Sequence, residues 1–136
     1  MSQPLKLLVV EDDPNLGNLL TEYLRAKGYA ADLRTDGQQG KEAYTQGGYD
    51  LLILDVMMPL KDGFTLAKEI RQKDTTTPII FVTAKSMKQD TIQGFQNGAD
   101  DYITKPFVME ELLLRISAVL RRANGAEPKA PEPDQY

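Results

Sequence analysis

Four short apolar runs most constrain how this chain can fold. They are Leu5–Val10, Leu51–Leu54, Ile79–Val82 and the weaker Tyr102–Thr104, and polar residues bound each of them. Runs of this length without regular polar alternation are typical of strands buried on both faces of a sheet. A fifth strand is predicted at Tyr29–Arg34. The runs therefore predict a sheet that is covered on both sides.

Helical patterns lie between the predicted strands. The first carries leucines at helical spacing, with Asp13 as the expected N-cap and Gly28 just past its end, and Asp62 is the expected cap of the third. The predicted helices are Pro14–Lys27, Gly37–Gln46, Gly63–Lys73, Met87–Asn97 and Val108–Ala123. Five alternating strand–helix units predict an α/β fold with a parallel sheet, helices on both faces, and a ligand site at the carboxyl ends of the strands.

Composition limits both the number of domains and the chemistry. The 136 residues suit one domain, predicted at 1–123, and the proline-rich segment 124–136 is expected to be a linker or tail. The chain has no cysteine and no histidine, which excludes disulfides, thiolate chemistry and histidine ligands. A net charge of −4 argues against nucleic-acid binding by this chain. With no long apolar run and no signal peptide, we expect no membrane association and a cytoplasmic location.

Polar residues follow the predicted strands at their carboxyl ends. Glu11 and Asp12 follow the first run, Asp55 follows Leu51–Leu54, Thr83 ends the next, and Lys105 follows the last. Carboxylates brought together in one crevice repel one another unless a cation neutralises them. Oxygen ligands without histidine or cysteine favour Mg²⁺. The alternative is that Asp12 and Asp13 only cap the first helix, which is the interpretation we favour for Asp13.

Asp55 has three possible uses: metal ligand, nucleophile or structural acid. Beside Mg²⁺ and a lysine, a carboxylate can attack phosphorus in line. Lys105 would supply the point charge and Thr83 a hydroxyl donor to a phosphoryl oxygen. A single threonine or lysine at such a position is usually structural or solvated, so the indication comes from the ordered set.

Four motifs carry a family resemblance that covers residues 5–123. VVEDD at 9–13, LLILDVMMPLKDG at 51–63, FVTAK at 81–85 and GADDYITKPF at 98–107 resemble receiver domains of two-component response regulators. The resemblance implies a flavodoxin-like (βα)5 fold with strand order 2-1-3-4-5. It implies that Asp55 accepts a phosphoryl group from a phosphohistidine on a sensor histidine kinase, held by Thr83 and Lys105, with a cis Lys105–Pro106 peptide. The implied Mg²⁺ ligands are Glu11, Asp12, Asp55 and the backbone carbonyl of Met57.

The resemblance also implies a switch and two contact surfaces. Thr83 and Tyr102 would move on phosphorylation and reshape the face of the fourth helix, fifth strand and fifth helix; alternatively, Tyr102 is simply an aromatic packed on a helix. The implied kinase contacts are Leu16, Leu19, Pro106 and Phe107, although Leu19 could equally be core. The sequence from Gly98 to Arg122 is similar to that of the OmpR/PhoB-type subclass. This similarity implies a homodimer whose ion pairs use Asp100, Asp101, Glu111, Arg115 and Arg122. Exposed ion pairs usually contribute only ~0–1 kcal/mol.

Three functions are compared. The leading hypothesis is a phosphoacceptor signalling domain, not an enzyme, with self-catalysed phosphorylation and dephosphorylation, which regulates transcription through an output domain absent from this chain. A stand-alone receiver or an interaction module that is never phosphorylated is the alternative. A Mg²⁺-dependent phosphatase is disfavoured, because Met57 occupies the position where such enzymes need a second aspartate.

Overall fold

The structure is a computed structural model, and it describes residues 4–58, 60–84, 96 and 99–123. Apart from Gln96, the predicted helix Met87–Asn97 lies outside the described residues, and so does the predicted tail 124–136. The boundary between domain and tail stays a prediction.

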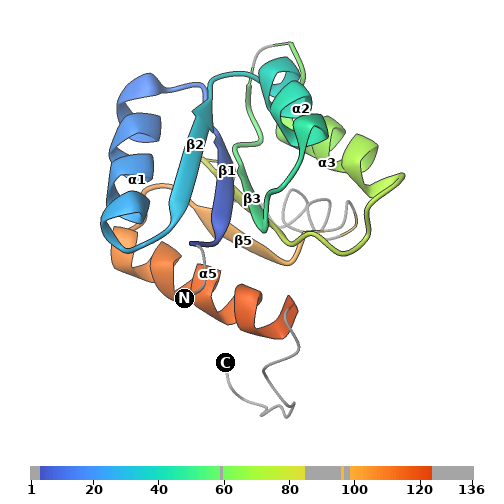
Figure 1. Cartoon of the computed structure of the whole chain (residues 1–136). Helices are drawn as coiled ribbons and strands as arrows, with labels where there is room; N and C mark the ends of the chain where they lie inside the picture. Colours follow the sequence, from blue (N-terminus) through green and yellow to red (C-terminus); the bar gives the residue numbers. More distant parts are fainter. Residues whose placement is uncertain (1–3, 59, 85–95, 97–98, 124–136) are drawn as a thin grey trace.

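Five parallel strands form one sheet in the order β2-β1-β3-β4-β5, which confirms the predicted topology (Figure 1). The strands are β1 (Lys6–Val10), β2 (Ala30–Arg34), β3 (Leu51–Leu54), β4 (Ile79–Thr83) and β5 (Asp101–Thr104). The central strands β1, β3 and β4 consist mainly of fully buried apolar residues. Burial on both faces explains why their sequences show no polar alternation.

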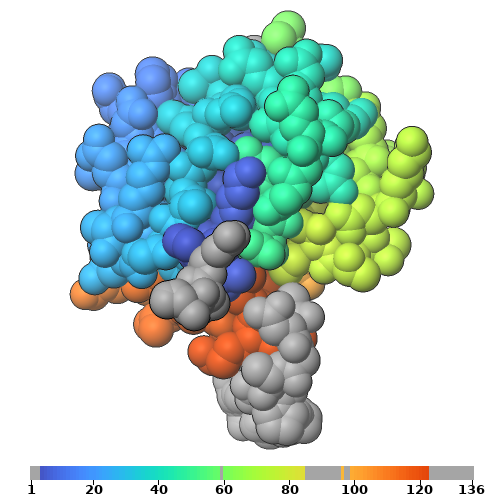
Figure 2. Space-filling model, in the orientation of Figure 1, coloured from blue at the N-terminus to red at the C-terminus, as the bar shows by residue number. Residues whose placement is uncertain are grey.

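Helices cover both faces of the sheet. They are α1 (Pro14–Ala26), α2 (Gly37–Gln46), α3 (Gly63–Arg71) and α5 (Met109–Ala123). In β1, Leu7 and Val9 pack with α1 and α5, whereas Leu8 and Val10 pack with α2 and α3. Figure 2 shows α2 and α3 side by side along one side of the molecule. Among the described residues, no helix is long and apolar enough to cross a membrane.

Acidic side chains start the helices at the carboxyl end of the sheet. Asp13 accepts a hydrogen bond from the backbone N–H of Asn15 at 3.0 Å, and Asp62 accepts one from Thr65 at 2.7 Å. Gly28 follows α1 with a φ of 101°, a conformation that suits glycine. These contacts confirm the predicted caps and fix where the polar loops leave the strands.

Two glycines allow close backbone approach beside β3. A Cβ atom on Gly63 would lie 2.2 Å from the carbonyl oxygen of Asp55. A Cβ atom on Gly37 would lie 1.9 Å from the carbonyl oxygen of Lys61. The first residues of α3 and α2 therefore press directly on the segment that follows β3. We call the described part of that segment, residues 56–58 and 60–62, the β3–α3 loop.

Candidate functional site

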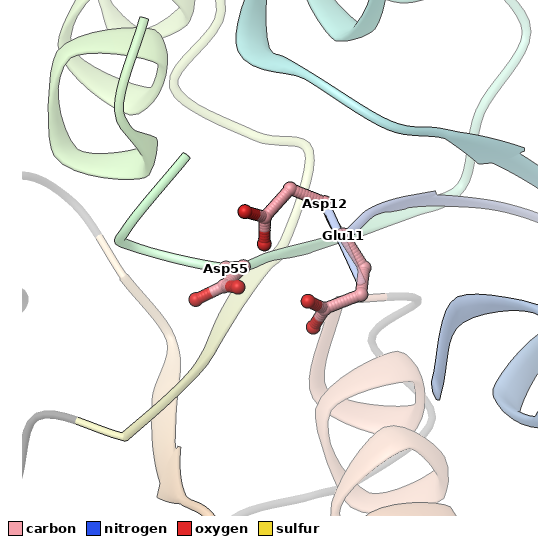
Figure 3. Close-up of side chains that lie close together, drawn as sticks. All are labelled: Glu11, Asp12 and Asp55. Carbon is pink, nitrogen blue, oxygen red and sulfur yellow. The ribbon is translucent and has the colours of Figure 1, made fainter. Parts of the chain in front are cut away.

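Three carboxylates converge at the carboxyl ends of β1 and β3. Glu11 and Asp12 follow β1, Asp55 follows β3, and one oxygen from each lies within 4.8 Å of the others (Figure 3). The two strands are neighbours, and the N–H of Asp55 donates to the carbonyl of Val10 at 2.9 Å. Glu11 is 2% exposed and Asp55 is 4% exposed, whereas Asp12 is exposed to solvent. The result is a buried acidic site that opens to the surface at Asp12.

Lys105 extends into the same site from the end of β5. Its Nζ lies 3.0 Å from an oxygen of Glu11 and 3.3 Å from Oδ2 of Asp55. Its backbone N–H donates to the carbonyl of Thr83 at 2.8 Å, which joins the ends of β4 and β5. The Lys105–Pro106 peptide is cis, as the resemblance implied. The structure therefore brings Glu11, Asp12, Asp55 and Lys105 together from three strand ends.

The charges in this site are only partly balanced. Burial, followed by the contact with Asp55, raises the pKa of Glu11 to about 7. Burial also raises the pKa of Asp55, although Glu11, Lys105 and the Met57 N–H act against that rise. Burial disfavours the charged form of Lys105, but its hydrogen bond to Glu11 and the two carboxylate charges outweigh burial and raise the pKa of Lys105. Two buried carboxylates share one ammonium, so a further cation would be favoured here.

The donor set fits a hard divalent cation. Its side-chain ligands are carboxylate oxygens, which Mg²⁺ prefers. The N–H of Met57 donates to Oδ1 of Asp55 at 3.3 Å, so the Met57 backbone lies beside the Asp55 carboxylate. The Met57 side chain is 58% exposed. The role of the Met57 carbonyl as a ligand stays a prediction.

The two predicted switch residues occupy different environments. Thr83 is the last residue of β4 and is fully buried. Tyr102 is half-buried, and its ring packs against Phe81 in an edge-on contact with 6.2 Å between ring centroids. Because Phe81 lies on β4, this contact does not decide between a switch residue and an aromatic packed on a helix, and both stay predictions.

The predicted kinase contacts differ in exposure. Leu19 is 57% exposed, so it is not a core residue. Pro106 is exposed, Leu16 is half-buried, and Phe107 is half-buried against the core on the α1–α5 side. Leu19 and Pro106 are thus accessible to a partner.

The predicted dimer residues line a hollow of about 400 Å³ beside α5. Within this one chain, Arg115 pairs with Asp101 at 2.9 Å and with Glu111 at 3.2 Å. Asp100 pairs with Arg71 at 3.4 Å, and Arg122 lines the same hollow. These side chains would have to exchange partners before Asp101 and Arg115 could pair between subunits.

Sequence reasoning did not single out Gly37, Lys61 or Glu69. Lys61 lies in the β3–α3 loop, and it contacts Gly37 on α2 and Glu69 on α3. No local pattern marks such contacts, because a glycine or a charged residue on a helix is common without them. Only the Asp62-Gly63 pair in the motif at 51–63 indicated locally where the loop ends, because Asp62 is the expected cap of the helix that follows.

Comparison with known proteins identifies the family of the chain. Residues 7–117 match the response regulator receiver domain. The chain is 57% identical over 129 residues to the transcriptional regulatory protein RprY of Bacteroides fragilis, covering 95% of this chain and 55% of RprY. It is 49% identical over 116 residues to the response regulator ArlR of Staphylococcus epidermidis, covering 85% of this chain and 52% of ArlR. The chain thus spans about half the length of these relatives.

Solved structures agree with this assignment. A two-component response regulator from Clostridium difficile superposes with a TM-score of 0.84 at 32% identity, covering 88% of this chain and 98% of that one. The BeF3-activated receiver domain of Klebsiella pneumoniae RstA gives a TM-score of 0.81 at 34% identity, covering 85% and 98%. A CheY-like receiver from Methanospirillum hungatei, at 22% identity and a TM-score of 0.87, supports the fold alone. The chain belongs to the response regulator receiver domain family.

Proposed function

We propose that this chain is a phosphoacceptor that receives a phosphoryl group on Asp55 from a phosphohistidine of a sensor histidine kinase. The observation that carries the proposal is the grouping of the buried Asp55 carboxylate with Glu11, Asp12 and Lys105. A nucleophile, an oxygen-ligand cation site and a positive point charge are the parts that phosphoryl transfer to a carboxylate needs. The chain would act as a signalling domain, and its covalent state would be the signal.

The ligands proposed for Mg²⁺ are Glu11, Asp12, Asp55 and the backbone carbonyl of Met57. When bound, the ion would neutralise charge on the phosphoryl oxygens. An oxygen of Asp55 forms the bond to phosphorus while the phosphorus–nitrogen bond to the kinase histidine breaks, and the electron pair leaves with the imidazole. Lys105 stabilises the charge of the transferred group, and the Thr83 hydroxyl donates to one of its oxygens.

The covalent change would alter contacts at the end of β5. The phosphoryl group carries nearly two negative charges and replaces the single charge of the Asp55 carboxylate, so the negative charge on oxygens beside Lys105 and Thr83 increases. Lys105 would then exchange its pairing with Glu11 for the phosphoryl oxygens, and Tyr102 would move with β5. The affected face comprises β5, α5 and the predicted helix Met87–Asn97. We propose that this face forms a homodimer and so regulates transcription through an output domain. The name of the relative RprY, a transcriptional regulatory protein, supports the link to transcription.

Intact-mass measurement after incubation with acetyl phosphate tests the proposal. We expect a gain of one phosphoryl group that needs Mg²⁺ and is lost in Asp55→Asn. Asp50→Asn is the matched control, because Asp50 is exposed at the opposite end of β3, where its carboxylate accepts a hydrogen bond from the backbone N–H of Lys6. Labelling that persists in Asp55→Asn would overturn the site. No labelling of the wild type by acetyl phosphate or by a phosphorylated histidine kinase would favour an interaction module.

A further inference from the structure

A three-residue ion network joins two helices to the β3–α3 loop. Glu69 on α3 pairs through one oxygen with Lys61 in the loop at 2.7 Å. Its other oxygen pairs with Lys41 on α2 at 2.9 Å. The side chains are only 29% exposed for Glu69, 17% for Lys61 and 35% for Lys41. Each oxygen of one carboxylate therefore holds a different segment.

The network acts on a loop whose backbone needs support. Leu60 has a φ of 71°, in the left-handed region that side chains other than glycine and asparagine rarely adopt, and its side chain is 82% exposed. Such a conformation costs free energy and persists only where the surroundings enforce it. An exposed leucine side chain gives little packing in return. The residues beside Leu60 in the loop must therefore hold its backbone in this conformation. Lys61 is the next residue in the chain.

Lys61 is held from two sides. Its backbone lies against the first residue of α2, where a Cβ atom on Gly37 would meet its carbonyl oxygen at 1.9 Å. Its side chain is held by Glu69. The two ends of the loop are also joined, because the N–H of Gly63 donates to the carbonyl of Val56 at 2.9 Å. Between these fixed points the N–H of Met57 reaches Oδ1 of Asp55.

The charge state of Glu69 agrees with a functional network. Hydrogen bonds from Lys61 and then from Lys41 lower the pKa of Glu69. An isolated exposed ion pair contributes little, but a partly buried network that shares one carboxylate between two cations fixes geometry more strongly. The net charge of the triad is positive. Without Glu69, the side chain of Lys61 would lose this ion pair and would no longer hold the loop against α3.

We propose that Glu69 is a positioning residue for the phosphoacceptor site: through Lys61 it fixes the β3–α3 loop, and so places the Met57 backbone beside Asp55. The inference rests on the proposed function, whose cation site and acceptor it concerns. Glu69 itself contacts neither phosphoryl donor nor metal. It sets the affinity for Mg²⁺ and the rate of phosphorylation from outside the site, through its ion pair with Lys61.

Glu69→Gln is the first test variant, because it keeps the shape of the side chain and removes its charge. We expect the Kd for Mg²⁺, measured by calorimetry, to rise about three- to tenfold, and the rate of labelling by acetyl phosphate to fall by a similar factor, since small misplacements in a site have effects of this size or larger. The melting temperature without Mg²⁺ should change little. Lys61→Met should reproduce both changes, and the double variant should add little to either. Lys61→Arg, which keeps the ion pair, should remain close to wild type.

Glu42→Gln is the matched control. Glu42 lies exposed on α2 next to Lys41, so the substitution alters net charge by the same amount in the same region. It should leave the Kd and the labelling rate unchanged. Wild-type values in Glu69→Gln, or equal losses in Glu42→Gln, would overturn the positioning role while labelling of the wild type still supported the proposed function. Absence of labelling in the wild type would overturn the proposed function instead, and a changed Kd in Glu69→Gln alone would then still support the effect on Mg²⁺.

Discussion

The charge of Glu11 depends on the groups that share its pocket. It is almost completely buried, touches Asp55, and has a pKa of about 7 against an ordinary value of 4.5. A group whose pKa is raised in the folded state contributes stability below its unfolded pKa and loses it as pH rises through the folded pKa. Without Mg²⁺, we therefore expect the free energy of unfolding to fall between pH 4.5 and about pH 7.

Urea unfolding across this pH range measures the effect. Glu11→Gln, which is neutral at every pH, should remove the Glu11 part of the decline. Saturating Mg²⁺ should do the same in the wild type, because the cation favours the ionised carboxylate. An equally steep decline in Glu11→Gln would show that Asp55 or another group is responsible.

Some residue-scale features could be predicted because they are local. Asp13 and Asp62 cap the helices that follow them, since a side chain three residues or fewer from its partner needs no tertiary information. The exposure of Leu19 stayed open, because helical spacing does not say how wide the buried stripe is. Parallel topology predicted that Lys105 lies in one crevice with Asp55 and Glu11, but the sequence could not show that its ammonium pairs with both carboxylates.

At the scale of the elements, burial decided what the sequence could predict. β3 and β4 are buried on both faces and were predicted almost to the residue. The edge strand β2 was a weaker prediction, because Asp32 and Arg34 interrupt its apolar pattern. The convergence of the strand ends followed from parallel topology alone, whereas the contacts of α2 and α3 with the β3–α3 loop depend on tertiary packing.

The connection from α3 to β4 is organised by Asp74. Its carboxylate accepts hydrogen bonds from the hydroxyl of Tyr44 on α2, from the hydroxyl and N–H of Thr77, and from the N–H of Thr76. Burial opposes ionisation, but the bonds from Thr77 and Tyr44 outweigh it and hold the pKa of Asp74 well below its usual range. One side chain thus ties α2 to the loop that leads into the central strand β4.

We expect Asp74→Ala to lower the free energy of unfolding by about 1–3 kcal/mol, because several donors lose their acceptor together. Tyr44→Phe removes one donor and should cost less. The double variant should cost less than the sum, since both substitutions disrupt one network. Urea unfolding at pH 7 measures all three. Additive losses would show that Tyr44 and Asp74 stabilise the fold independently.

For the whole molecule, the path from Asp55 to the proposed dimer face is short. Lys105 contacts Asp55 and directly follows β5, and Asp101 at the other end of β5 holds Arg115 on α5. A strand of four residues therefore separates the phosphoryl site from the ion pairs beside α5. If phosphorylation draws Lys105 inward, the change reaches Asp101 and Arg115 through one rigid element.

This arrangement predicts that Lys105→Ala separates labelling from assembly. The variant keeps Asp55 and the carboxylates proposed for Mg²⁺, so acetyl phosphate should still label it, although more slowly because a positive charge is lost. Without the ammonium, no ion pair at this position connects the phosphorylated Asp55 to the end of β5. Light scattering should then show a phosphorylated monomer where the labelled wild type forms a dimer. Lys68→Ala, an exposed lysine on α3, should dimerise like the wild type. A full shift to dimer in labelled Lys105→Ala would mean that the signal leaves the pocket through another residue, and Thr83 at the end of β4 would be the next to test.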